Sequence, residues 1–164
     1  MKLFIKRAFR VFLGIILLAG AIAGVEYFGG QPMGLFSGSR PANLGYTNGA
    51  FSPPSWKPNC VSSTVEKSDK HYIEPLAYSG AADAAWKKLQ SVVNATPRVN
   101  VVQSSAAYLY AEFKSAGLGF VDDVEFALDE KASIIHVRSA SRMGVRDFNV
   151  NRARIDSIRA QLGK

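Results

Sequence analysis

Two neighbouring segments, residues 120–128 and 133–139, constrain the fold of this chain more than any other feature of its sequence. In both segments apolar side chains recur at every second position, and ionisable or polar side chains fill many of the positions between them. A period of two residues is typical of strands that bury one face. The four intervening residues (129–132) are short enough for a turn, so the pattern predicts a β-hairpin.

Pairing Leu128 with Ser133 across the turn predicts which side chains meet. The apolar pairs are then Phe126 with Ile135 and Val124 with Val137, and the polar pairs are Glu125 with His136 and Asp123 with Arg138. A slip of one residue would mix the two faces. Opposite-charge pairs of this kind contribute only about 0.2–1 kcal/mol each. A solvated polar face and a site that binds an anion or moves a proton therefore both remain open interpretations.

The other periodicities predict three further strands, at residues 71–78, 98–103 and 106–115, and two helices, at 81–95 and 151–162. Asn151 or Asn149 is the expected N-cap of the second helix. The last four strands follow one another through short turns. We therefore expect an α+β fold, a two-layer sandwich in which an antiparallel meander of four to five strands carries both helices on one face.

An uncharged apolar run at residues 11–25 follows four basic side chains in the first ten residues. With its flanking apolar residues, the segment 8–28 reaches the length of about 20 residues that a transmembrane helix needs. The basic flank predicts a single-pass inner-membrane protein with a cytoplasmic N-terminus and a periplasmic domain. Small residues at 19–21 and 21–23 leave a cleavable signal peptide as the alternative. The expected parts are an anchor or signal peptide (1–28), a Gly/Pro-rich linker (29–58) and an α+β domain (59–164).

The charge of the chain argues against a nucleic-acid partner. The whole chain carries +7, but from residue 27 onward 16 Lys and Arg face 12 Asp and Glu, a net of only +4. The charges are unevenly placed, since residues 112–130 are acidic and residues 138–164 are basic, and this favours oriented docking. A single cysteine, Cys60, excludes an intramolecular disulfide, and with only two histidines no metal site or cofactor is expected.

Residues 138–152 bring hydroxyls, arginines and a helix N-terminus into one loop. These groups suit an anion-binding pocket, but they suit a structural loop equally well, with Gly144 in a turn, Asp147 paired with an arginine and Asn151 capping the helix. No nucleophile–base pair is fixed by the spacing, so no catalytic residue is assigned. The candidate ligand or partner surface comprises Asp123, Glu125, His136, Arg138, Ser139, Ser141, Arg142, Asp147, Asn151 and Arg152.

Four motifs resemble a family of uncharacterised proteins, a domain-of-unknown-function group found in proteobacteria and related to plastid proteins. They are PNCVSS (58–63), GFVDDVEF (119–126), IHVRSASR (135–142) and NRARIDSIR (151–159). The family pattern Gly-x-x-Asp-x-x-x-Asn-Arg corresponds here to Gly144, Asp147, Asn151 and Arg152. The resemblance implies a compact domain, commonly behind an N-terminal membrane segment, and it brings no established activity, cofactor or catalytic residue.

These features favour a membrane-anchored extracytoplasmic domain that serves as a binding or accessory module of a membrane complex or envelope component. The expected partners are the lipid bilayer, through residues 8–28, and a membrane protein complex or an anionic ligand. The alternative is a hydrolase-like enzyme that combines the acidic side chains and His136 of the hairpin with the hydroxyls of Ser139 and Ser141. A pocket in which these groups converge would support the enzyme, and a flat arrangement would argue against it.

Overall fold

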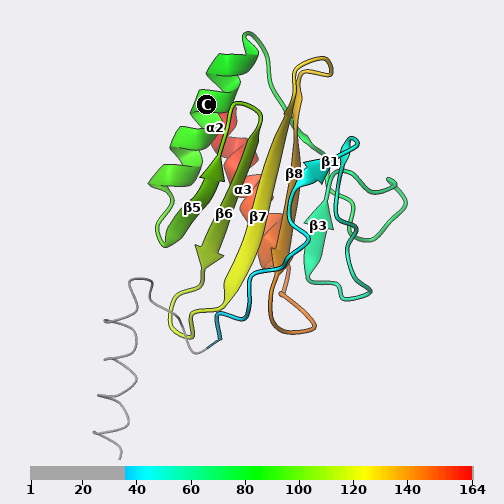
Figure 1. Ribbon diagram of the computed structural model, residues 1–164, viewed down its shortest axis with the longest axis vertical. Helices are drawn as coiled ribbons and strands as arrows, with labels where there is room; N and C mark the ends of the chain where they lie inside the picture. Colours follow the sequence, from blue (N-terminus) through cyan, green and yellow to red (C-terminus); the bar gives the residue numbers. More distant parts are fainter. Residues whose placement is uncertain (1–35, 164) are drawn as a thin grey trace, which may run out of the picture. The chain divides into compact units, whose positions relative to one another are not determined.

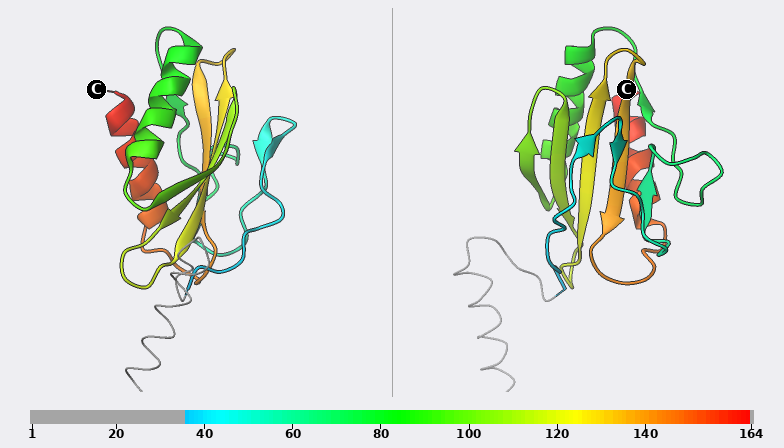
Figure 2. Two further views of the ribbon diagram at one scale, coloured as in Figure 1. Left: turned by 60° about the vertical axis from the view of Figure 1, so that its left-hand side comes forward. Right: turned by 45° about the vertical axis from the view of Figure 1, so that its right-hand side comes forward.

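The computed structural model describes residues 36–163. In this part of the chain an antiparallel sheet carries two helices on one face, while the segment that precedes the sheet runs over the other face (Figures 1 and 2). The predicted α+β class is thereby confirmed. The predicted anchor at residues 1–28 lies outside the described residues. Between residues 36 and 163 no helix has the length and apolar character needed to cross a bilayer.

Four long strands form the antiparallel meander in the order that the sequence predicts. They are β5 (Val99–Ser104), β6 (Tyr108–Lys114), β7 (Val121–Asp129) and β8 (Ile134–Ser141). The alternation of side chains along β6 distinguishes the two faces of the sheet. Leu109, Ala111 and Phe113 are buried against the helices, whereas Tyr108 and Tyr110 point to the opposite face, because alternate side chains of a strand lie on opposite sides.

The sheet has six strands rather than the predicted four to five, because two short strands pair with the free edge of β8. These are β3 (Cys60–Ser62), which pairs near the end of β8, and β4 (Leu76–Ala77), which pairs near its start. The predicted strand at residues 71–78 is thus reduced to β4 and an isolated bridge between Tyr72 and Ser62. A strand of three residues such as β3 is too short to show a period in the sequence.

The β7–β8 hairpin pairs two residues away from the predicted register. Phe126 lies opposite Val137 and Glu125 lies opposite Arg138, so the predicted pairs Glu125–His136 and Asp123–Arg138 are wrong. A shift of two leaves every side chain on its predicted face, and hydrophobic alternation cannot detect it. The turn decides the register. Residues 130–133 form it, Ser133 adopts a left-handed conformation (φ 54°), and Asp129 Oδ1 accepts a hydrogen bond from the backbone N–H of Ala132 (3.0 Å).

The hydrophobic core lies between the meander and the helices α2 (Ala82–Ala95) and α3 (Val150–Leu162). Each helix turns an apolar stripe toward the sheet, as helical spacing predicts. The buried helix residues are Trp86, Leu89 and Val93 from α2 and Ile155 and Ile158 from α3. The predicted cap of α3 needs correction, because Asn149 occupies the N-cap position without a side-chain hydrogen bond, and Asn151 lies inside the helix and is buried.

Residues 36–51, which we call the strap, run across the sheet face that the helices leave open (Figure 2). The strap ends in a small hairpin of β1 (Tyr46–Thr47) and β2 (Ala50–Phe51), whose turn places Asn48 and Gly49 at positive φ, as a two-residue turn of this type requires. The ring of Tyr46 packs edge-on against Phe51, which is buried. The strap therefore covers a sheet face that would otherwise meet solvent.

Candidate functional site

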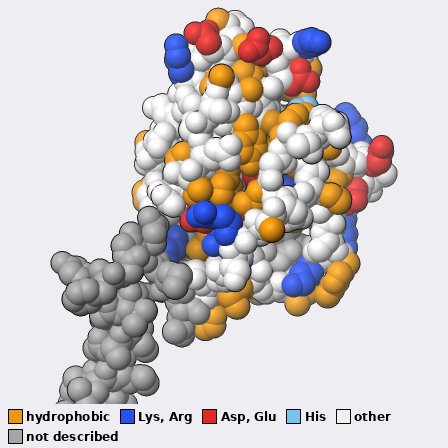
Figure 3. Space-filling view, viewed as in Figure 1, with side chains coloured by type: hydrophobic (Ala, Val, Ile, Leu, Met, Phe, Trp, Pro, Cys, Tyr) orange, Lys and Arg blue, Asp and Glu red, His pale blue; other side chains and the backbone are white. Residues whose placement is uncertain are grey.

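The face of the sheet under the strap, which we call the outer face, is built from buried charges. Asp123, Glu125 and Arg138 are only 1 %, 0 % and 7 % exposed. In Figure 3, which looks onto this face, hydrophobic side chains and other uncharged atoms make up most of the visible surface over the middle of the sheet. The interpretation of this face as solvated is therefore wrong, and its charges need internal partners because burying an unpaired charge is very costly.

Glu125 is the centre of the first set of contacts. Its Oε2 accepts a hydrogen bond from Arg138 Nη1 at 2.9 Å, and its Oε1 accepts from the hydroxyl of Tyr108 at 2.8 Å and from the backbone N–H of Gly45 in the strap at 2.6 Å. Three donors from three segments thus satisfy one carboxylate. Burial and the adjacent negative charge of Glu125 raise the pKa of Tyr108, so this hydroxyl remains a donor at any physiological pH.

Asp123 is the centre of the second set. Arg142 donates to both of its oxygens, with 2.9 Å from Nε to Oδ2 and 2.7 Å from Nη2 to Oδ1, and Tyr110 donates its hydroxyl at 2.5 Å. Arg142 also pairs with Glu112, which in turn binds Arg40 of the strap at 2.8 Å. This alternation of carboxylates and guanidinium groups neutralises every charge in the chain of contacts.

Opposing effects set the ionisation of this second set. Burial disfavours the charged form of Glu112, but hydrogen bonds from Arg142, Arg40 and Asn100 outweigh it and lower its pKa to about 2. Burial likewise works against the charge of Arg142, yet Asp123 and Glu112 raise its pKa. Burial and the hydrogen bond to Asp123 raise the pKa of Tyr110. Glu112 therefore stays ionised and Tyr110 stays protonated at neutral pH.

His136 lies on the same face but outside this network. Its Nδ1 is 3.2 Å from the hydroxyl of Ser63, and its ring stacks on Tyr46 with 5.7 Å between the centroids. Burial lowers the pKa of His136, partly offset by Asp129, so the ring is neutral at pH 7. The hydroxyl of Ser63 is also engaged by the backbone of Val137, whose N–H donates to it at 2.9 Å. Ser63 and His136 are thus in contact, but the Ser63 oxygen already accepts a hydrogen bond from the backbone of β8.

The predicted serines lie on the other side of the sheet, facing α3. Both hydroxyls contact Asn151, whose Oδ1 accepts from Ser139 at 2.6 Å and whose Nδ2 donates to Ser141 at 2.9 Å. Arg154 completes this cluster by donating to Asn151 Oδ1 at 2.6 Å and pairing with Asp122 at 2.5 Å. The cluster fastens α3 to β8 and leaves no free serine hydroxyl among its members.

Asp147 and Arg152 do not contact each other and play different structural parts. The carboxylate of Asp147 accepts the backbone N–H groups of Asn149 (3.2 Å) and Asn151 (3.0 Å), so it caps α3 rather than pairing with an arginine. Arg152 donates to the carbonyl oxygen of Tyr72 at 2.7 Å, away from both clusters. The ten predicted surface residues are thus divided among the outer face, the α3 cluster and an isolated contact, and they do not form one pocket.

This division bears on the chemistry that the domain can perform. The sheet separates the hydroxyls of Ser139 and Ser141 from Asp123, Glu125 and His136. Of the acidic groups considered for the enzyme, Asp122 lies on the serine side, where Arg154 holds its carboxylate. The geometry therefore does not support the hydrolase-like constellation, which needs these groups within hydrogen-bond reach. Among residues 36–163 no three His, Cys, Asp or Glu side chains are grouped to hold a metal ion. Cys60 is buried, and burial raises the pKa of its thiol to about 11, which disfavours the reactive thiolate.

Several residues of the outer-face network were not predicted from the sequence: Arg40, Tyr108, Tyr110, Glu112 and, beside His136, Ser63. Tyr108, Tyr110 and Glu112 alternate with the apolar residues of β6, so their common face could have been inferred from the period of two. Arg40 comes from a segment of linker composition that carries no such signal, and Ser63 follows β3, whose strand was not predicted. Both join the site only through long-range contacts.

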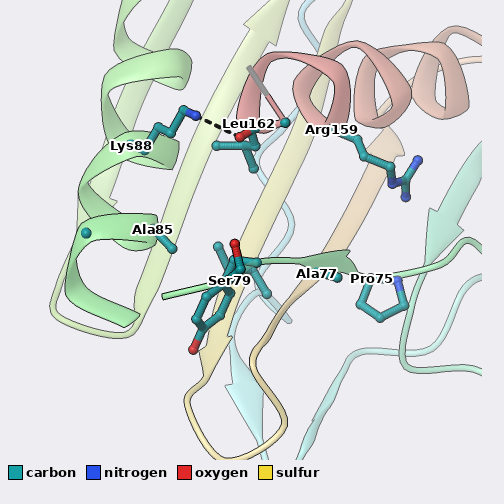
Figure 4. A pocket seen from close by; sticks show the side chains of 11 residues that line it. Pro75, Ala77, Ser79, Ala85, Lys88, Arg159 and Leu162 are labelled. Atoms are coloured by element: carbon teal, nitrogen blue, oxygen red, sulfur yellow. Dashed lines mark hydrogen bonds between the residues drawn. The ribbon is translucent and has the colours of Figure 1, made fainter. Parts of the chain in front are cut away.

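A groove of about 810 Å³ lies on the helix side of the domain, between β4 and the helices α2 and α3 (Figure 4). Two cations, Lys88 and Arg159, line it together with Tyr78, and no carboxylate does. Lys88 donates to the carbonyl oxygen of Leu162 at 2.7 Å, and the buried hydroxyl of Tyr78 has no partner among the described residues. Arg159 also pairs with Asp156, which is not part of this lining, and donates to the carbonyl oxygen of Glu74 at 2.6 Å.

Comparison with known proteins identifies a family. The family model described as "Protein of unknown function (DUF1499)" matches residues 51–162, which include the six-stranded sheet, both helices and every site residue except those of the strap before Phe51. No curated protein matches the chain. The expected resemblance to a family of uncharacterised proteins is thereby confirmed.

Proposed function

Since the chain belongs to the family of proteins of unknown function described as DUF1499, we propose that it is a membrane-anchored binding or accessory module, held outside the cytoplasm at a membrane complex or envelope component. One observation carries this proposal. Two carboxylates of the outer face, Glu112 and Glu125, bind the strap, which is the segment that connects the domain to the predicted anchor.

Three contacts from the strap support this view. Arg40 pairs with Glu112, the backbone of Gly45 binds Glu125, and Tyr46 stacks on His136. These three contacts hold the strap against the sheet, so residues 36–51 are part of the folded domain. Only residues 29–35 lie between the predicted anchor and Phe36, and seven residues reach at most about 25 Å when extended. The domain would therefore stay within one domain diameter of the bilayer.

The groove between α2 and α3 supports the binding part of the proposal. Its lining includes Lys88, which donates to a carbonyl oxygen, and Arg159, whose ion pair with Asp156 is exposed and could be exchanged for an acidic segment or another anionic group of a partner. On the outer face, by contrast, the buried carboxylates and guanidinium groups are paired with one another, with Arg138 Nε as the one buried polar atom there that lacks a partner among the described residues, and this supports a rigid module more than a catalyst.

Topology is the direct test of the anchor. The full chain with a C-terminal tag should remain in the membrane pellet after alkaline extraction, and protease added to spheroplasts should remove the tag without lysis. Release by alkali would contradict the anchor, and protection of the tag until lysis would contradict the extracytoplasmic location.

Binding is tested separately by native mass spectrometry of the gently solubilised chain. We expect a stoichiometric partner or a bound anion that is lost in the Lys88→Ala/Arg159→Ala variant, with Lys131→Ala, changed in the exposed β7–β8 turn, as the control. An empty monomer in every preparation would contradict the binding module.

A further inference from the structure

Exposed hydrophobic side chains gather at one end of the domain. Of the seven large hydrophobic residues exposed among residues 36–163, four lie in two loops (Leu118, Met143, Val145 and Phe148), and a fifth, Val150, begins α3 directly after the second loop. Phe148 is 90 % exposed. Single exposed hydrophobics are common on soluble proteins, but a concentration of this kind at one end usually marks a contact surface.

The two loops lie at the same end of the sheet. Leu118 belongs to the turn between β6 and β7, which opens after Lys114 and closes before Val121. The loop of residues 142–149 follows β8, and the backbone N–H of Arg142 donates to the carbonyl oxygen of Val121 at 3.2 Å. Both loops are at the lower edge of the domain in Figure 1, and Figure 3 shows hydrophobic side chains along the same edge.

Hydrogen bonds hold the second loop in shape, and Phe148 lies near its end, just before α3. Asn59 donates to the carbonyl oxygen of Gly144 at 3.1 Å, and Asp147 accepts the backbone N–H of Asn149. Phe148 and Asn149 both adopt left-handed conformations (φ 52° and 65°). A bulky side chain rarely takes this conformation without a reason, and here the conformation directs a large apolar ring into solvent.

The chain also enters the described domain at this end. The ring of Phe36 stacks on Phe120 with 5.0 Å between centroids, beside the Leu118 turn. At Gly38 the strap passes so close to the second loop that an added Cβ would lie 3.0 Å from Arg142 Cβ and Met143 Cγ. The first described residues, Phe36 to Gly38, thus lie close to both hydrophobic loops.

We propose that this end of the domain is a membrane-contacting surface, in which Phe148, Val145, Met143 and Leu118 insert into the bilayer interface. The proposal rests on the proposed membrane anchor. The bilayer is the occupant favoured here because the short segment 29–35 brings this end of the domain to the membrane before any other. Arg146, which is exposed, lies between Val145 and Phe148 in the sequence, and basic groups beside apolar ones are what an anionic lipid interface attracts.

The test uses the full chain in proteoliposomes of phosphatidylcholine and phosphatidylglycerol. In a Trp56→Phe background, Phe148→Trp places a reporter at the proposed surface, and Ala132→Trp places the matched control in the exposed β7–β8 turn. The nine residues of β7 separate the two positions by about 27 Å. Trp86 is buried in both variants and contributes a constant signal.

We expect brominated lipids to remove about half or more of the emission of the Phe148→Trp reporter, because interfacial side chains bury about 5–10 Å deep, while the emission of the Ala132→Trp control is unchanged. Iodide in the water should quench the control and spare the reporter. Val145→Trp should reproduce the lipid quenching if the change at Phe148 disturbs the turn.

Three outcomes would overturn the proposal. Iodide quenching of the Phe148→Trp reporter without lipid quenching would show that the loop is in water. Protection of this reporter from both quenchers would show that a protein or a second copy of the chain covers it. Lipid quenching of both the reporter and the Ala132→Trp control would show a domain lying on its side. In each case the chain must resist alkaline extraction, so that failure of the anchor itself is recognised separately.

Discussion

Glu125 shows how strongly a single side chain depends on its neighbours in this fold. It lies in the middle of a sheet, has no exposed surface, and accepts hydrogen bonds from Arg138, Tyr108 and Gly45. A buried ion pair adds little stability compared with apolar residues of the same size, but removing one partner leaves the other charge uncompensated. The outer face is therefore sensitive to single substitutions and tolerant of matched double ones.

Glu125→Ala should lower the free energy of unfolding by about 3–5 kcal/mol, because it leaves the Arg138 guanidinium buried without its counter-charge. Asp156→Ala, which removes an exposed ion pair with Arg159, should change it by less than about 0.5 kcal/mol. The double variant Glu125→Leu/Arg138→Met should recover part of the loss, because it removes the unpaired guanidinium but still leaves Tyr108 and Gly45 without their acceptor. Urea unfolding followed by Trp86 emission measures all three. Equal effects of the two single substitutions would contradict this account.

Glu112 should make the domain sensitive to acid. Its folded pKa of about 2 lies below the value of 4.5 for an unperturbed glutamate, so the unfolded chain binds the proton more readily. The stabilisation is therefore complete above pH 4.5 and is lost as the pH falls toward 2. Glu112→Gln should flatten the dependence of unfolding free energy on pH across this window, while Glu130→Gln, changed in the exposed turn, should leave it as in the parent. An unaltered slope in Glu112→Gln would rule out this source of acid sensitivity.

The start of α3 shows how an element can be fixed from outside its own sequence. The N-cap residue, Asn149, makes no side-chain hydrogen bond to the helix. Asp147, three residues before the helix, accepts the backbone N–H groups of Asn149 and Asn151 instead. Asn151 in the first turn then binds β8 and the backbone of Asn59. The helix is thus capped and docked by the same few residues.

Asp147→Ala should lower the free energy of unfolding by about 1–2 kcal/mol, as the loss of a helix cap does. Amide hydrogen exchange should also accelerate in the first turn of α3 before it does in α2. Asp147→Asn keeps an acceptor oxygen and should cost less, and Asp83→Ala in the exposed first turn of α2 serves as the control. If exchange at the first turn of α3 were unchanged in Asp147→Ala, the cap would lie elsewhere.

At the scale of the whole molecule, the structural domain extends beyond the region that the family model matches. The match begins at residue 51, but the strap before it supplies Arg40 to Glu112 and Gly45 to Glu125. The strap also covers His136 through Tyr46. The two-layer sandwich therefore gains a third, partial layer that comes from a segment of linker composition.

A chain that begins at Phe36 should unfold cooperatively and retain the stability of the domain. A chain that begins at Ser52 contains nearly all of the matched region but should be less stable by about 3 kcal/mol or more, because Glu112 and Glu125 lose charged or N–H partners. Urea unfolding of the two chains measures the difference. Equal stabilities would mean that the strap rests on the sheet without fastening to it.

Much of this fold follows from the sequence alone, because its signals are local. Period-two alternation placed Val124, Phe126 and Val137 on the buried face, and helical spacing identified the stripes of α2 and α3. The same alternation, followed to the predicted end of β8 at residue 139, would have put Ser139 on the helix side and away from Asp123. The meander order followed from short turns between successive strands, which leave antiparallel pairing as the only connection.

The tertiary structure decided what local patterns leave degenerate. A register shift of two residues preserves the faces, so only the turn at Ser133 could exchange the partner of Glu125 from His136 to Arg138. Whether a polar strand face meets water or another segment is likewise invisible in the strand itself. It became a buried charge network because a segment some 80 residues away in sequence lies across it, as the 2.6 Å contact between Gly45 and Glu125 shows. Alternation in a sequence specifies a face, and only the folded chain supplies what that face touches.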